Sequence, residues 1–204
     1  MIAGQERQNE SVHAVRLHRL RTGRSAIAAA AIGVAAASMS AVPGVTGAMG
    51  ATLGLIMLAI AVIDMRHFII PDPLNAAAFV LGLAQAVVMN GQERWTAVAD
   101  ASLRAAVLAA LFLILRAGYA RLRGWDGIGL GDVKLAAVAG VWLDWAVMPI
   151  AIEIAALSAL GAYAIHHVLR RRAMRANARV PFGLFFAPSI WIGWLLQTIL
   201  YHGA

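Results

Sequence analysis

The chain has 204 residues, of which 61% are hydrophobic and 13% are charged, and it contains no cysteine. So little polar surface cannot cover a soluble globule of this size, which indicates an integral membrane protein. The absence of cysteine excludes disulfides, thiol catalysis and cysteine-based metal sites. Lys and Arg outnumber Asp and Glu by 17 to 10, but they cluster between apolar runs, where they indicate topology rather than nucleic-acid binding.

Apolar segments of about the length that crosses a bilayer recur along the chain. We expect an all-α, polytopic membrane helix bundle of about seven transmembrane helices, because no alternating pattern of barrel strands is present. The segments cover about 25–42, 44–63, 74–89, 103–120, 132–148, 150–168 and 181–201. Asp72, followed by Pro73, is predicted to be the N-cap of the third helix.

The segments divide into an N-terminal part and a main domain. We predict a basic cytoplasmic segment at 1–24, an additional transmembrane helix at 25–42 and a membrane domain of six helices at 44–201. Alternatively, the first apolar segment is a signal peptide that ends in the small residues of 38–41. Its cleavage would leave six helices with the same orientation.

Basic residues mark the cytoplasmic loops of membrane proteins. They gather in the leader and in the second, fourth and sixth connections, which fall on one side if seven helices alternate. The opposite connections offer only Arg94 and, less clearly, Arg104. The N-terminus is therefore predicted in the cytoplasm and the C-terminus outside. The basic residues of the cytoplasmic side are Arg7, Arg16, Arg19, Arg21, Arg24, Arg66, Arg116, Arg121, Arg123, Arg170, Arg171, Arg172, Arg175 and Arg179.

Asp64 and Asp132 lie at the ends of apolar segments, where a carboxylate is costly and usually functional. Both are predicted at the cytoplasmic end of the bundle. Helix dipoles should favour the ionised form of Asp132 and the protonated form of Asp64. Such a pair suits an aspartic dyad, in which one carboxylate activates water while the other donates a proton. Alternatively, Asp132 only caps its helix and Asp64 only pairs with Arg66 or His67.

Two glycines precede Asp132. Gly129 and Gly131 remove side chains at positions where an extended peptide backbone would approach the carboxylate. Alternatively, they form a flexible turn before the helix.

These residues carry a family resemblance. The segment 129–135 (GLGDVKL) resembles the GxGD-x-K-L motif of the type IV prepilin peptidases, and Asp64 followed by 70–72 (IPD) and Asn75 resembles their first catalytic-aspartate block. Pro181, Phe182 and Gly183 resemble the tripeptide that opens the family's last helix. The three blocks occur in the family's order and span roughly 44–201.

The resemblance implies a membrane-embedded aspartic endopeptidase of the bacterial inner membrane, without metal or cofactor. Such enzymes remove the short basic leader of type IV pilin-like precursors at the cytoplasmic face. Asp64 and Asp132 match the catalytic pair. The motif residue Lys134 either supports the dyad or extends to the interface, and Asp72 is more simply a cap than a third catalytic carboxylate.

The family's larger members also carry a cysteine-containing domain and N-methyltransferase activity. Since this chain has neither the cysteines nor the room, we expect a stand-alone peptidase similar to those of Tad or Flp pili. Three other readings stay open: a presenilin-like protease, disfavoured because no Pro-Ala-Leu motif lies near the C-terminus; a transporter subunit using Asp64, Asp132 and Glu153; and a non-catalytic scaffold.

Overall fold

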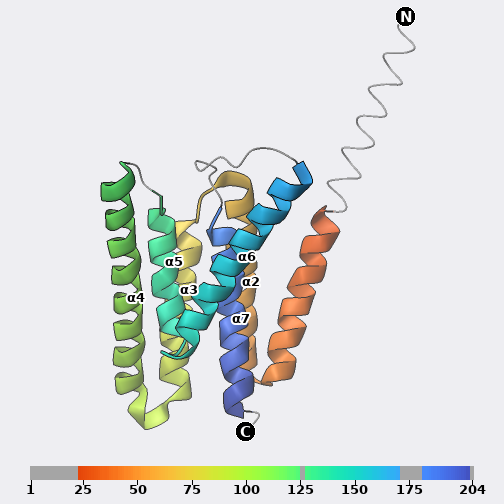
Figure 1. Ribbon diagram of the computed structural model, residues 1–204. Helices are drawn as coiled ribbons and strands as arrows, with labels where there is room; N and C mark the ends of the chain where they lie inside the picture. The colour runs from red at the N-terminus through yellow and green to blue at the C-terminus, as the bar shows by residue number, and fades with distance from the viewer. Residues whose placement is uncertain (1–22, 125–126, 171–180, 203–204) are drawn as a thin grey trace, which may run out of the picture.

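The computed structural model describes residues 23–124, 127–170 and 181–202 and arranges them as a bundle of α-helices that run alternately up and down (Figure 1). All the regular structure in these residues is helical, which confirms the predicted fold class. A 3₁₀ turn at Gly91–Glu93 joins the third and fourth helices. The helices are an N-terminal helix Gly23–Ala41, α2 Val45–His67, α3 Asp72–Met89, α4 Arg94–Arg123, α5 Leu130–Trp142, α6 Val147–Arg170 and α7 Gly183–His202.

Six of these helices are long and apolar enough to cross a membrane. The exception is α5, whose 13 residues extend only about 20 Å at 1.5 Å per residue. It is shorter than the predicted 132–148 because the chain turns at Asp144, whose carbonyl accepts the N–H groups of Val147 and Met148, each at 3.0 Å. The continuous apolar run of α5 reflects burial inside the bundle, where Leu135 and Ala136 are fully covered.

The helix α4 begins at Arg94, well before the predicted 103. Its first turns tolerate charge because Arg104 forms an ion pair with Asp100, one turn earlier. Arg104 is itself buried and donates to the carbonyl of Gly140 at 3.1 Å. It is therefore a packing residue of α4 rather than a loop charge that reports topology.

Glycines allow the central helices to approach closely, as small residues do in membrane proteins. A Cβ at Gly140 of α5 would lie 2.6 Å from the backbone of Ala105 in α4. A Cβ at Gly50 of α2 would lie 1.9 Å from the ring of Trp194 in α7. A larger side chain at Gly140 would therefore separate α5 from α4, and one at Gly50 would displace Trp194 from α2.

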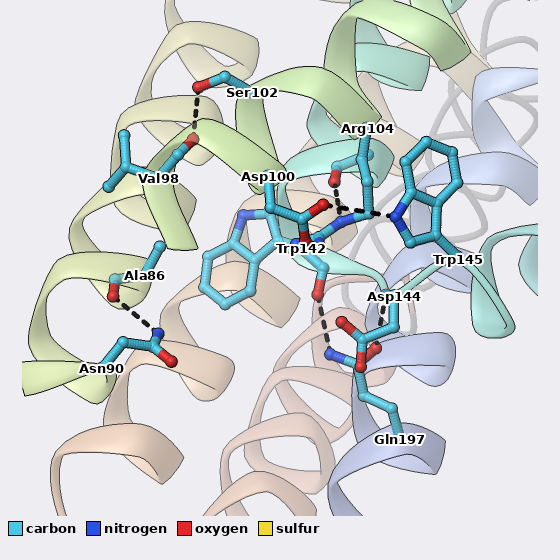
Figure 2. A network of polar contacts seen from close by, with 11 residues as sticks. Ala86, Asn90, Val98, Asp100, Ser102, Arg104, Trp142, Asp144, Trp145 and Gln197 are labelled. Atoms are coloured by element: carbon cyan, nitrogen blue, oxygen red, sulfur yellow. Dashed lines mark hydrogen bonds and ion pairs between the residues drawn. The ribbon is translucent and has the colours of Figure 1, made fainter. Parts of the chain in front are cut away.

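Polar contacts join α4, α5 and α7 at the end of the bundle where α5 finishes (Figure 2). Gln197 donates to the carbonyl of Trp142 at 2.8 Å and accepts from the Asp144 N–H at 3.1 Å. The Trp142 indole donates to the carbonyl of Ala78 at 2.8 Å. Trp142 and Trp194 are buried in helix packing, whereas Trp145 is exposed.

Several topology residues lie outside the described residues, among them most of the basic segment 1–24 and Arg171, Arg172, Arg175 and Arg179 of the sixth connection. Within the described part of the chain, the α2–α3 and α4–α5 connections lie at the same end of the bundle (Figure 1). That arrangement agrees with the alternation on which the charge count depends.

Candidate active site

Asp64 lies in the last turn of α2, with only 5% of its surface exposed. Its Oδ2 accepts a hydrogen bond from the backbone N–H of Leu184 at 2.9 Å, and the Gly183 backbone also donates to it. Since α7 begins at Gly183, the carboxylate occupies the N-terminus of that helix, where unpaired N–H groups bind anions. The hydrogen bonds of Asp64 thus go to α7, while its neighbours Arg66 and His67 are exposed.

The start of α7 is fixed by an aromatic contact and by a glycine. The ring of Phe182 lies 5.3 Å from that of Phe186 and 6.5 Å from that of Phe112 in α4. A Cβ at Gly183 would lie 2.9 Å from Oδ2 of Asp64. Phe182 therefore anchors the helix start, and Gly183 lets that start reach the carboxylate.

Asp132 lies in the first turn of α5, outside the candidate membrane-spanning helices. Its Oδ2 accepts the N–H of Gly129 at 3.1 Å. Gly129, not Asp132, is the N-cap residue of α5, and Asp132 closes the helix start from the third helical position. Burial raises the pKa of Asp132 to about 6, the Gly129 hydrogen bond opposes the rise, and the negative charge of Asp64 adds to it. Burial therefore opposes the effect predicted for the helix dipole, which favours the ionised form of Asp132.

Asp64 and Asp132 belong to one site, and Ile70 lies between the elements that carry them. A Cβ at Gly131, the residue before Asp132, would lie 3.0 Å from Cβ of Ile70. A Cβ at Gly183, against Asp64, would lie 2.8 Å from Cδ1 of the same Ile70. The α2–α3 linker therefore packs between the starts of α5 and α7.

The two motif glycines consequently have neighbours within the chain. Gly131 faces Ile70 rather than open space, and a Cβ at Gly129 would lie 3.2 Å from the Asp132 carboxylate. Gly131 thus leaves room for Ile70, and Gly129 leaves room for the Asp132 carboxylate. Gly129 is exposed and Gly131 is partly exposed, and the approach of an extended peptide to the Asp132 carboxylate stays a prediction.

Asp72 does not act as the predicted N-cap. The helix α3 begins at Asp72 itself, Pro71 is the N-cap residue, and no side chain in the described part of the chain caps this end. The Asp72 carboxylate instead accepts a hydrogen bond from Lys134 of α5 at 2.6 Å. Lys134 thus pairs with Asp72, and its predicted support of the dyad stays a prediction.

Some residues around the site were missed or misjudged from the sequence. Arg116 was counted as a topology charge, yet it donates to the carbonyl of Ile128 at 2.8 Å and so holds the loop before Asp132. Leu184 contributes its backbone N–H to Asp64. Because any residue except proline could do so, the sequence gives no sign of this role. Glu153, the third carboxylate of the transporter alternative, is exposed on α6.

Among the described residues, no group of three His, Asp or Glu side chains lies close enough together to hold a metal ion. The described site offers two carboxylates, each of which accepts hydrogen bonds from backbone N–H groups.

The fold and the site define a class: a multi-pass helical membrane protein with two carboxylates gathered at one end of its bundle. The chain belongs to the type IV leader peptidase family, whose model matches residues 51–165. The matched region includes Asp64 and Asp132 and ends before Pro181.

Two relatives illustrate the similarity. The chain is 36% identical over 171 residues to a prepilin leader peptidase/N-methyltransferase of Burkholderia pseudomallei (strain K96243), covering 77% of this chain and 50% of that protein. It is 32% identical over 132 residues to the leader peptidase HopD of Escherichia coli, covering 64% of this chain and 82% of that protein. The chain thus spans about half the length of the Burkholderia relative. No solved structure matches it.

Proposed function

We propose that this protein is an aspartic endopeptidase that removes the short basic leader from type IV pilin-like precursors. Family membership supports the reaction class. The single observation that carries the proposal is the convergence of Asp64 and Asp132, from helices far apart in the sequence, around Ile70. The charge of Asp64 reaches Asp132 and raises its pKa.

In the proposed mechanism, the two carboxylates share one proton and act on a water molecule between them. The ionised carboxylate removes a proton from the water as its oxygen attacks the scissile carbonyl carbon. The protonated carboxyl stabilises the carbonyl oxygen. When the C–N bond breaks, the departing amine takes up the proton that the first carboxylate removed from the water, which returns the pair to its starting state. A pKa of about 6 for Asp132 suits a pair that must hold and release a proton near neutral pH.

The remaining motif residues are proposed to position the pair. Gly183 and Phe182 place α7 against Asp64, while Gly129 and Gly131 allow α5 to begin beside Ile70. Pro181 precedes this helix start. The Asp72–Lys134 ion pair joins the starts of α3 and α5.

We also propose that the enzyme lies in the bacterial inner membrane with its active site at the cytoplasmic face, as the distribution of basic residues favours. Because the chain has no cysteine, single cysteines can report this topology. Arg123→Cys should be shielded from an impermeant thiol reagent in intact cells, whereas Gln92→Cys should be labelled. The reverse pattern would move the site to the other side of the membrane.

The absence of methyltransferase activity is part of the proposal. It is supported by the lack of cysteine and by the similarity to the leader peptidase HopD, of which this chain covers most. The segment 44–201 is then the peptidase domain, preceded by the additional helix. With precursor and labelled S-adenosylmethionine, the purified protein should leave the new N-terminus unlabelled. Stoichiometric methyl transfer would contradict this.

The activity itself is tested by incubating the purified protein with a precursor that has a basic leader followed by an apolar helix. We expect mass spectrometry to find one cut between the leader and the apolar segment. A precursor that stays intact in the presence of folded protein would contradict the proposed function.

A further inference from the structure

A groove lies between α3 and α5, and its lining includes Lys134, two residues after Asp132. Its cavity volume is about 340 Å³, and its walls include Phe79 of α3 with Ala137 and Val138 of α5. The Asp72–Lys134 pair stands at one end of it. The groove is therefore charged where α3 and α5 begin and apolar along their first turns.

The lining also contains a buried amide without a partner. Asn75 is only 4% exposed, and neither its Nδ2 nor its Oδ1 has a hydrogen-bond partner among the described residues. A buried polar group without a partner is costly, and such groups in native proteins call for an explanation. A carboxamide offers one acceptor and two donors, which matches the C=O and N–H of a peptide backbone. The groove thus contains an amide group that could pair with a peptide backbone and that makes no hydrogen bond within the described chain.

The groove runs along the first turns of α5, the helix that carries Asp132. Val138 lies six residues after Asp132 on α5, which is about 9 Å along the helix axis. An extended peptide advances about 3.3 Å per residue, so this distance holds about three residues. With the starts of α3 and α5 at the cytoplasmic face, as proposed, the apolar end of the groove lies deeper in the membrane. The precursor residues held there would be those of its membrane-spanning segment.

We propose that this groove binds the precursor immediately after its cleavage site, with the Asn75 carboxamide hydrogen-bonded to the precursor backbone. The inference rests on the proposed peptidase function. A transmembrane helix must unwind around its scissile bond to be cut, which leaves backbone groups without partners in an apolar medium. Asn75 supplies a partner, Phe79 and Val138 contact the apolar side chains, and Asp72 with Lys134 marks the boundary with the basic leader.

The first test compares Asn75→Leu with Gln85→Leu, a change of another α3 amide about 15 Å away along the helix. Loss of the backbone contacts should raise the KM for precursor about tenfold, with a smaller effect on kcat. Because the carboxamide has no hydrogen-bond partner among the described residues, Asn75→Leu should not lower the Tm. An unchanged KM, or a Tm lowered in parallel with activity, would overturn the inference. Gln85→Leu should cleave like the wild type.

The second test does not depend on cleavage. In an Asp132→Asn background, Phe79→Cys should form a disulfide with a precursor that carries cysteine two or three residues after the cleavage site, and not with cysteine in the leader. Val80→Cys, which is exposed on the next position of α3, is the matched control. Equal crosslinking from positions 79 and 80, or none from 79, would overturn the groove assignment. If the wild type fails to cleave, the proposed function falls, and this crosslink still decides whether the groove binds the precursor.

Discussion

The carboxylate of Asp64 accepts a hydrogen bond from the backbone N–H of Leu184, a residue 120 positions later in the chain. This contact brings the end of α2 to the start of α7. It depends on the glycine at 183, because a Cβ there would lie 2.9 Å from the Asp64 oxygen and 2.8 Å from Ile70. The motif that opens α7 therefore positions the carboxylate of the motif that ends α2.

Gly183→Val should push the start of α7 away from Asp64 and remove most of the cleavage activity. A displacement of about 1 Å at a catalytic group can cost roughly a hundredfold in rate. The control is Gly33→Val in the N-terminal helix, where a Cβ meets nothing within 4 Å. Both variants are assayed for precursor cleavage at matched expression. Equal activity in the two would show that the α7 start does not position Asp64.

Gly131→Val should be similarly damaging, because the new side chain would press on Ile70, 3.0 Å from its Cβ. Gly127 is unsuitable as a control, since a Cβ there would lie 2.3 Å from the Tyr119 ring. Gly161 has open space around it, so Gly161→Val should cleave normally. If position 131 tolerates valine as well as position 161 does, the contact with Ile70 has no functional weight.

Much of this arrangement could be predicted because the signals are local. Runs of apolar residues locate the helices, and Asp64 and Asp132 stand out as carboxylates at the ends of such runs. The assignment of Asp72 as an N-cap was also local, and it was wrong because Lys134, 62 residues away, takes the carboxylate. The same holds for Arg104, whose burial between α4 and α5 no loop count reveals.

Other features depend on three-dimensional contacts that leave no local pattern. The length of α5 is set by the turn at Asp144 and its contact with Gln197. The anchoring of α7 depends on the stacking of Phe112 on Phe186, whose ring centroids lie 5.4 Å apart. Aromatic residues are common throughout such helices, so composition alone could not select these two.

The raised pKa of Asp132 predicts a pH dependence of stability. Its pKa is about 6 in the folded protein and about 3.9 when unfolded, so the folded state binds this proton more tightly. The resulting stabilisation is full below about pH 4 and is lost as the pH rises through 6. Relative to Asp132→Asn, the wild-type Tm should therefore fall between pH 4.5 and pH 7.5. A Tm difference that stays constant across this range would contradict the assigned burial of Asp132.

The Asp72–Lys134 pair should contribute little to stability, because the side chains are 70% and 51% exposed. Ion pairs at such exposure are worth less than about 1 kcal/mol. A double-mutant cycle of Asp72→Asn and Lys134→Gln, followed by denaturant unfolding, measures this coupling. A coupling energy well above that value would mean that the pair is a structural brace between α3 and α5.

The central claim is that Asp64 and Asp132 together perform the cleavage, and single amide substitutions test it most directly. Asp64→Asn and Asp132→Asn keep the side-chain shape but remove the proton chemistry, so each should lower precursor cleavage by at least about a hundredfold. Glu153→Gln, which changes an exposed carboxylate of α6, is the matched control and should cleave at the wild-type rate. All variants are first checked for folding in the membrane. Full cleavage by either folded aspartate variant would contradict the dyad.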